Sequence, residues 1–203
     1  MDEFTYEQEN IREKLELYEW DNVWWEQANR ECEKRVLYVG DSISCGIRRI
    51  ATEMAKGRML FDGFGTSKAL DNPFFKDSLR IFAKQQGKRS AIIFNNGLHG
   101  WHLDDETEYP RYYEDTVKFL LEEFPKTPLL LLLTTHVARA DREERVQKRN
   151  AAVLEIAKKY GLETVDLYTV SCRHEDLLTD GVHFNTEGYR FLADEILKHL
   201  DFI

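Results

Sequence analysis

Ser42 is the first residue of this 203-residue chain whose type and surroundings suit nucleophilic chemistry. Gly40-Asp41-Ser42 follows an apolar run and precedes a segment of helical periodicity, so the Ser42 hydroxyl is expected at a tight strand-to-helix turn. The first amides of such a helix attract negative charge. The same pattern is typical of a helix cap, in which Asp41 or Ser42 only satisfies those amides. Ser42 is therefore a candidate nucleophile that needs support from other segments.

A candidate base lies near the other end of the sequence, in Asp180-Gly181-Val182-His183. A serine nucleophile needs a base, and a histidine base needs an acceptor that fixes its tautomer. His183 and Asp180 offer both from one loop, although Asp180-Gly181 is also typical of a simple turn. The loop precedes the last helical segment of a chain whose first strand delivers Ser42, and this position favours the catalytic interpretation.

Candidate oxyanion donors follow the second and third apolar runs. Asn95-Asn96-Gly97-Leu98-His99-Gly100-Trp101-His102 groups two amides and two imidazoles around two glycines. Neutral donors of this kind suit the negative charge that develops in acyl transfer. A turn with surface histidines is the alternative interpretation. In segment 62–68, Gly63 and Gly65 let backbone amides approach a ligand closely, so an N–H there is a second candidate donor.

The elements that position these segments follow from the hydrophobic pattern. Apolar runs predict strands over residues 35–39, 58–62, 91–94, 129–134 and 163–167. Amphipathic segments predict helices over residues 43–55, 73–86, 111–123, 142–160 and 186–200. The strand runs do not alternate polar with apolar residues, which indicates parallel strands covered on both faces.

The predicted fold class is α/β, a three-layer α/β/α doubly wound domain with a flavodoxin-like five-stranded parallel sheet. Ligands bind such sheets at the carboxyl ends of the strands, where the three candidate segments lie. We expect residues 1–34, with their clustered tryptophans, to form an N-terminal helical extension packed on the domain. Residues 35–203 are expected to form the domain itself.

Composition and charge exclude several classes of function. The net charge of −9 disfavours nucleic-acid binding. The longest apolar run is too short to span a membrane, and the first ten residues have no export-signal pattern, so we expect a cytoplasmic protein without a membrane partner. Three widely spaced cysteines predict no disulfide framework. Phosphate-loop and zinc-binding patterns are missing from the sequence, so we expect no cofactor and no metal.

Taken in order, the four segments resemble the blocks of the SGNH, or GDSL, hydrolase superfamily over residues 35–200. The resemblance implies that Ser42 is the nucleophile, His183 its general base and Asp180 the acceptor that orients His183. It also implies an oxyanion hole built from the N–H of Ser42, the N–H of a glycine in the second block, and the asparagine side chain of a Gly-x-Asn-Asp motif.

The third block departs from the family pattern. Gly97-Leu98-His99-Gly100 aligns with the Gly-x-Asn-Asp motif, so His99 stands at the asparagine position. His99 donates through its ring, or Asn95 or Asn96 takes over the role. Some bacterial, carbohydrate-associated branches are similar in carrying an Asn-x-Gly-Leu-His segment. In the second block Gly65 is preferred, with Gly63 and Ser67 as competitors.

The resemblance implies a serine esterase that works through an acyl-enzyme. The sequence has no long apolar lid segment, so we expect short acyl groups, with an acetylated carbohydrate or similar small polar ester as the small-molecule partner. Asp41 and Trp101 are predicted to contact that substrate, whereas Trp20, Trp24 and Trp25 more often pin an N-terminal segment to its domain. Two alternatives stay open: a non-catalytic carbohydrate-binding or scaffold domain that retains the fold, and a flavodoxin-like nucleotide-binding domain.

Overall fold

The computed structural model describes residues 15–31 and 34–200 of the chain. Strands and helices alternate along these residues, and two of the helical boundaries have clear local causes. Asp41 caps the helix that begins at Ser42. Gly161 follows the long helix Ala140–Tyr160 and ends it in a left-handed conformation, with φ at 63°. In chain order the elements are β1 (Asp21–Trp24), β2 (Arg35–Gly40), α1 (Ser42–Met54), β3 (Leu60–Thr66), α2 (Phe75–Gln86), β4 (Ala91–Phe94), α3 (Glu108–Glu123), β5 (Leu129–Leu132), α4 (Ala140–Tyr160), β6 (Glu163–Val165), α5 (Leu167–Arg173), the 3-10 helix η1 (Glu175–Leu177) and α6 (Thr186–Leu200).

A single sheet with the strand order β1-β3-β2-β4-β5-β6 forms the middle of the molecule. The strands from β2 to β6 pair in parallel, and β1 joins the edge of β3 in the antiparallel direction. The order of the parallel strands is that of a doubly wound, flavodoxin-like sheet. The predicted parallel strands are therefore confirmed, and the structure adds one antiparallel edge strand to them.

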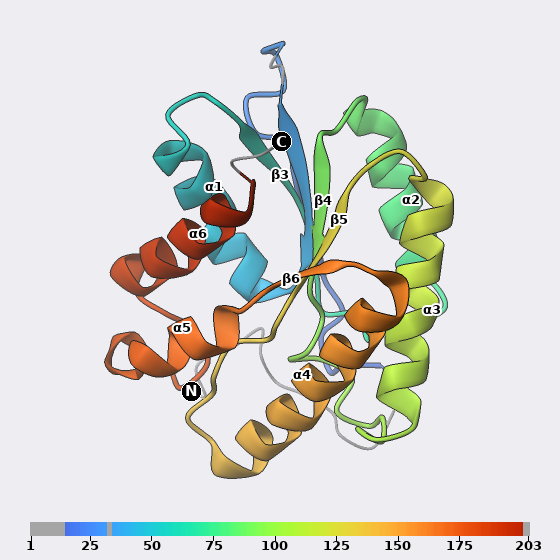
Figure 1. Ribbon diagram of the computed structural model, residues 1–203, viewed down its shortest axis with the longest axis vertical. Coiled ribbons are helices and arrows are strands. Elements are labelled where there is room, and N and C mark those ends of the chain that lie inside the picture. The colour runs from blue at the N-terminus through green and yellow to red at the C-terminus, as the bar shows by residue number, and fades with distance from the viewer. Residues whose placement is uncertain (1–14, 32–33, 201–203) are drawn as a thin grey trace.

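Helices cover both faces of the sheet, with α1, α5 and α6 on one side and α2, α3 and α4 on the other (Figure 1). Neighbouring residues of one strand pack into opposite cores. In β2, Val36 and Tyr38 belong to the core under α1 and α6, whereas Leu37 and Val39 belong to the core under α2 and α3. This two-sided burial explains why the strand sequences are continuously apolar.

The described part of the N-terminal segment corrects the prediction of a helical extension. Residues 15–31 contain the strand β1 and no helix, while residues 1–14 and 32–33 lie outside the described residues. The side chains of β1 are exposed, so the segment has no buried apolar face that would stabilise an amphipathic helix against the domain. Instead β1 pairs with the otherwise open edge of β3, and Arg48 donates to Asn22.

β3 is longer than predicted because its two glycines are packing residues. The prediction ended the strand at Asp62 and treated Gly63 and Gly65 as part of a loop. In the structure a Cβ on Gly63 would lie 2.6 Å from the Arg48 side chain, and a Cβ on Gly65 would lie 2.5 Å from the Cys45 sulfur. The two glycines therefore let α1 lie directly on the strand.

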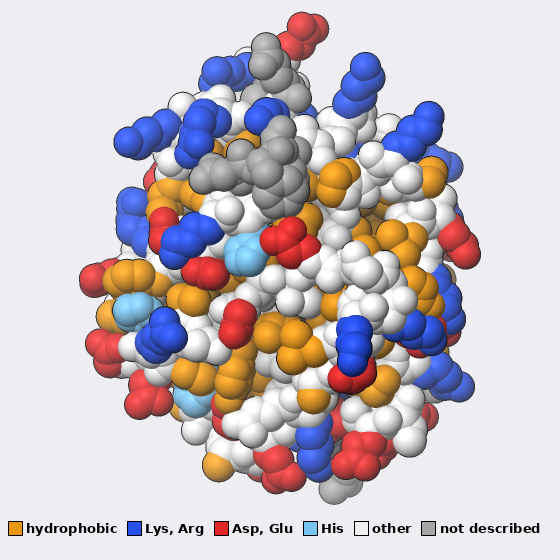
Figure 2. Space-filling model, in the orientation of Figure 1, with side chains coloured by type: hydrophobic (Ala, Val, Ile, Leu, Met, Phe, Trp, Pro, Cys, Tyr) orange, Lys and Arg blue, Asp and Glu red, His pale blue; other side chains and the backbone are white. Residues whose placement is uncertain are grey.

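The surface carries charges of both signs. Acidic and basic side chains are interspersed over the face shown in Figure 2, apart from a gathering of Lys and Arg at its upper end. Among the helices that the structure describes, none combines the length and the apolar character needed to cross a membrane.

α1 and α6 pack closely at Gly46, where an added Cβ would lie 2.3 Å from the ring of Tyr189. We expect Gly46→Ala to destabilise the protein by about 1–3 kcal/mol because the core has no room for the methyl group. In a domain of this size each kcal/mol lowers the Tm by roughly 2–4 °C, which thermal unfolding followed by circular dichroism measures.

The control for this prediction is the same change in a Tyr189→Ala background. There the space is open, and alanine exceeds glycine in helix propensity by roughly 1 kcal/mol, so Gly46→Ala should be neutral or stabilising. An equal loss of stability in both backgrounds would contradict the proposed steric cause.

Candidate active site

Ser42 lies at the carboxyl end of β2, where one residue, Asp41, separates the strand from α1. The Asp41 carboxylate accepts the Ile43 N–H at 3.0 Å, and the Asp41 carbonyl accepts the Ser44 hydroxyl at 2.6 Å. Ser42 is thereby fixed in the first turn of the helix, where the amides favour negative charge. The prediction that Asp41 contacts the substrate is corrected, because its side chain is buried and caps α1.

Asp180 and His183 lie in a turn before α6 that is held by hydrogen bonds among its own residues. One Asp180 oxygen accepts the N–H groups of Val182 at 3.0 Å and His183 at 2.7 Å. The Thr179 N–H donates to the His183 carbonyl at 2.8 Å, and Gly181 takes a left-handed φ of 89° that the turn requires. The turn therefore fixes the acid and the imidazole relative to each other.

A continuous hydrogen-bonded chain joins Asp180, His183 and Ser42. His183 Nδ1 lies 2.8 Å from the second Asp180 oxygen, and His183 Nε2 lies 2.7 Å from Ser42 Oγ. With Nδ1–H donating to the carboxylate, Nε2 is the ring nitrogen that accepts a hydrogen bond from the Ser42 hydroxyl. The structure thus brings together three residues that the sequence analysis selected from segments 141 positions apart.

The ionisation of Asp180 suits this arrangement. Burial raises the pKa of Asp180, but the hydrogen bonds from the His183 backbone and ring and from the Val182 backbone outweigh it and hold the pKa below its ordinary value. The carboxylate therefore stays ionised at neutral pH, and it keeps the imidazole in the tautomer that leaves Nε2 as the acceptor.

The amide side chains of the third block serve the structure. Asn95 Nδ2 donates to the Leu132 carbonyl at 2.8 Å and to Thr134 Oγ1 at 3.0 Å, which uses both of its hydrogens and corrects its selection as an oxyanion donor. Asn96 Nδ2 donates to the Lys68 carbonyl at 3.0 Å and so ties the third block to the second. Both amides therefore hold neighbouring segments together at the carboxyl ends of the strands.

His99 and Asn96 stay as the side-chain candidates for the oxyanion hole, because the bond to Lys68 uses one of the two hydrogens of Asn96 Nδ2. His99 is buried, its Nδ1 lies 3.5 Å from the Glu16 carboxylate, and the Trp20 ring meets it edge-on. Gly65 lies against the Asp41 backbone, but it also pairs with Asn22 of β1, and the register that turns the Ser67 N–H toward the Trp20 carbonyl turns the Gly65 N–H toward β1 as well, away from Ser42. This corrects the preference for Gly65 as the second backbone donor. Of its competitors, Ser67 already donates its N–H to the Trp20 carbonyl. Gly63 lies two residues further down the strand.

A cavity of about 310 Å³ adjoins the turn of residues 180–183, which is called the catalytic turn below. Trp101, predicted to contact substrate, lines it, and the Arg142 guanidinium lies 4.2 Å from the centre of the Trp101 ring. Apolar side chains form most of the remaining wall. The residues around the cavity are Leu98, Trp101, Val137, Ala138, Arg139, Arg142, Asp180, Gly181 and Val182.

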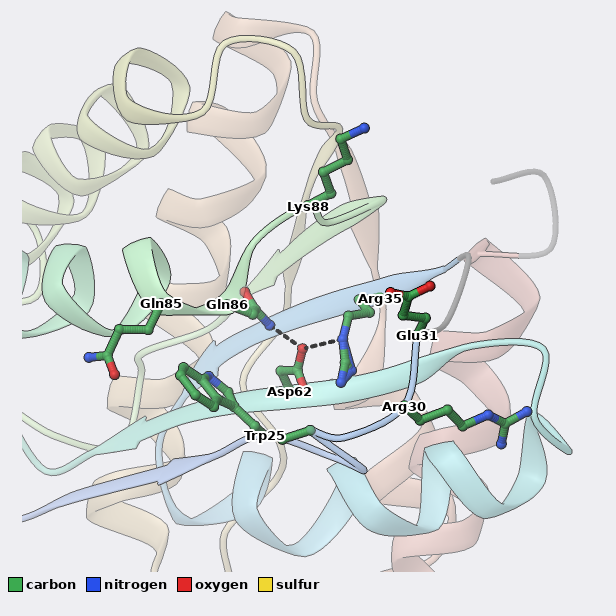
Figure 3. A pocket seen from close by; sticks show the side chains of 9 residues that line it. Trp25, Arg30, Glu31, Arg35, Asp62, Gln85, Gln86 and Lys88 are labelled. Atoms are coloured by element: carbon green, nitrogen blue, oxygen red, sulfur yellow. Dashed lines mark hydrogen bonds and ion pairs between the residues drawn. The ribbon is translucent and has the colours of Figure 1, made fainter.

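A larger hollow of about 630 Å³ lies near the start of β2 (Figure 3). There the buried Asp62 carboxylate accepts hydrogen bonds from Gln86 and the Glu26 N–H and lies 3.5 Å from Arg35. Burial raises the pKa of Asp62. Because Ser42 follows the opposite end of β2, this hollow is separate from the catalytic turn, and Asp62 ties the N-terminal segment to α2 and β3.

The sequence analysis missed several residues that build the site. Arg149, on α4, donates to the carbonyls of Gly97, His99 and Gly100. Glu143, also on α4, accepts the Val137 N–H at 3.0 Å and so holds the loop beside the catalytic turn. A signal for Arg149 existed, because it shares one helical stripe with the buried Val146 and Val153. A charged residue at an apolar position of that stripe indicates a buried partner.

Comparisons with known proteins agree with this fold. No protein-family model and no curated sequence matches the chain. Among solved structures, a GDSL-like lipase from Bacteroides thetaiotaomicron is 16% identical and has a TM-score of 0.65, with 83% of this chain and 88% of that chain covered. An acetyl xylan esterase variant from Geobacillus stearothermophilus is 15% identical with a TM-score of 0.64, covering 84% and 96%. The catalytic domain of peptidoglycan O-acetyltransferase A from Streptococcus pneumoniae is 17% identical with a TM-score of 0.64, covering 85% and 95%.

The chain therefore has the fold of the SGNH, or GDSL, hydrolases, and the predicted fold class is confirmed. At these identities the likeness concerns the fold.

Proposed function

We propose that this protein is a serine ester hydrolase that removes short acyl groups, acetyl above all, from a carbohydrate or a similar small polar alcohol. The observation that carries the proposal is the Asp180–His183–Ser42 chain, whose two links measure 2.8 and 2.7 Å. If Ser42 only capped a helix, no histidine would need to lie beside its hydroxyl. If residues 180–183 only formed a turn, no carboxylate would need to accept from the His183 ring. The combination at the carboxyl edge of this fold supports catalysis.

The mechanism follows from the geometry. His183 Nε2 takes the proton of Ser42 Oγ as the oxygen attacks the ester carbonyl, and Asp180 stabilises the imidazolium that forms. The N–H group of Ser42 and the ring of His99 are proposed to stabilise the oxyanion. His183 then protonates the leaving alcohol. Water, activated by the same histidine, hydrolyses the acyl-enzyme and restores Ser42.

The size and wall of the adjoining cavity support a small substrate. A volume of about 310 Å³ is at the lower end of the range for small-molecule sites, and apolar side chains make up most of its lining. Two of the structurally similar proteins are described as an acetyl xylan esterase and a peptidoglycan O-acetyltransferase, which both concern acetyl groups on polysaccharides. Trp101 forms part of the cavity wall, but its ring is buried and has the Arg142 and Arg149 guanidiniums 4.2 and 4.3 Å from its centre, so it offers little open face to a sugar.

A series of 4-nitrophenyl esters tests this proposal. We expect the acetate to be hydrolysed at least about tenfold faster than the octanoate, measured as kcat/KM, because the sequence has no long apolar lid segment to cover a longer acyl chain. An active-site phosphonate should add one adduct to the intact mass, and peracetylated sugars should release acetate. A protein that neither hydrolyses any ester nor takes up the phosphonate would instead fit a non-catalytic carbohydrate-binding or scaffold domain.

A further inference from the structure

Arg149 is a fully buried arginine at the centre of the third block. It lies on α4, its side chain has no exposed surface, and its guanidinium is in contact with the rings of Trp101 and Tyr109 at 4.3 and 4.4 Å. Burying a guanidinium is costly unless every donor finds an acceptor. Its position in the interior therefore calls for a specific role.

The acceptors of Arg149 are the carbonyl groups of the oxyanion segment 97–100. Nη1 donates to Gly97 at 2.9 Å and to His99 at 2.7 Å, Nη2 donates to Gly100 at 3.0 Å, and Nε donates to Asp105 at 2.7 Å. Asp105 supplies the compensating negative charge. One side chain thus determines the direction of three carbonyls within four residues.

Fixing a carbonyl also fixes the next amide. In a planar trans peptide the N–H points opposite to the preceding carbonyl, so the Leu98 and Gly100 N–H groups point away from Arg149. The structure bears this out at Gly100, whose N–H donates to the Glu16 carboxylate at 3.1 Å. The same constraint sets the backbone on both sides of His99, and hence where its ring lies.

We propose that Arg149 is a positioning residue for oxyanion stabilisation, an inference that rests on the ester hydrolysis proposed above. By holding the carbonyls of residues 97, 99 and 100, Arg149 places the ring of His99 for the transition state. It touches neither the nucleophile nor the reacting carbonyl. Its contribution therefore belongs to the rate of the chemical step and not to substrate binding.

Arg145 provides a matched comparison on the same helix. It is a partly exposed arginine that also pairs with Asp105, but it donates to the outer carbonyls of Trp101 at 2.8 Å and Leu103 at 2.7 Å. Arg145→Lys therefore removes a similar number of contacts from the same loop and leaves the carbonyls of residues 97–100 in place.

The experiment compares Arg149→Lys and Arg145→Lys with the wild type, using 4-nitrophenyl acetate and a boronic acid that forms a tetrahedral adduct on serine. We expect Arg149→Lys to lower kcat by about 10²-fold with KM little changed, since a lysine cannot span the three carbonyls. The inhibition constant of the boronic acid should weaken by a similar factor. Arg145→Lys should stay close to the wild type in both measurements, with thermal unfolding run alongside.

Two results would overturn the inference. One is an Arg149→Lys variant that keeps the wild-type kcat and boronic-acid affinity. The other is an equal loss of activity in both lysine variants that follows only their loss of Tm. If Arg149→Lys does not fold, Asp105→Asn, which weakens the hold on the guanidinium, should show a smaller loss in kcat in the same direction. A wild type inactive on all esters and unlabelled by a phosphonate would instead refute the proposed function and, with it, this inference.

Discussion

Ser42→Ala is expected to lose at least about 10⁴-fold in kcat/KM for 4-nitrophenyl acetate, because no other atom can form the acyl-enzyme at this site. The hydroxyl that is removed lies 2.7 Å from His183 Nε2 and in the first turn of α1. Two measurements check the prediction: the hydrolysis rate, and the intact mass after treatment with an active-site phosphonate. The variant should show no adduct.

Ser44→Ala is the matched control, because it removes a hydroxyl from the same helix two residues further on. The buried Ser44 Oγ donates to the Asp41 carbonyl at 2.6 Å, so its loss should cost about 1 kcal/mol of stability while the enzyme stays active and is labelled. If Ser42→Ala hydrolyses the ester at the wild-type rate, the nucleophile lies elsewhere and the proposed mechanism is wrong.

Asp180→Asn should lower kcat by about 10³- to 10⁴-fold and change KM little. An asparagine can present an N–H to His183 Nδ1, which places the imidazole proton on Nε2 and leaves that nitrogen unable to accept from Ser42. The pKa of Asp180 lies below its ordinary value, so the wild-type carboxylate stays ionised through mild acid. Steady-state kinetics with 4-nitrophenyl acetate at neutral pH measure kcat and KM for the variant and the wild type.

Asp176→Asn is the control for this change, since it makes the same substitution at an exposed residue of η1. It should leave kcat unaltered. An Asp180→Asn variant with wild-type kcat at neutral pH would show that His183 is oriented by its other contacts, and Asp180 would then be only a turn residue.

The parts of the fold that depend on local pattern were predictable. Ala91–Phe94 and Thr186–Leu200 have the predicted bounds, because a continuous apolar run or a helical stripe is a property of adjacent residues. β1 was missed because its four residues are exposed and its stability comes from backbone pairing with β3, which leaves no periodic signal. The end of β3 was missed because glycines that allow close packing resemble glycines that make a loop.

In the candidate site, too, the residues in local motifs were predictable, and those whose roles depend on distant contacts were not. Ser42, Asp180 and His183 were selected from motifs, and the structure places them in one hydrogen-bonded chain. Residue type alone did not separate His99 from Asn95. The acceptor that engages the Asn95 amide, the Leu132 carbonyl, lies 37 positions away and depends on how β4 and β5 align. Arg149 was missed because three of its hydrogen bonds go to backbone carbonyls, which every residue has, so its sequence neighbours do not show which segment it holds.

The turn that holds both Asp180 and His183 also determines when the proposed catalytic residues can first come together. Ribosomes make chains from the N-terminus, and a domain folds as its segments emerge. The nucleophile is made early, but the acid and base arrive together 138 and 141 residues later, and they meet Ser42 only when α6 packs against α1. A nascent or truncated chain that ends before this turn therefore lacks the proposed base, and the proposed activity requires that α6 has packed against α1.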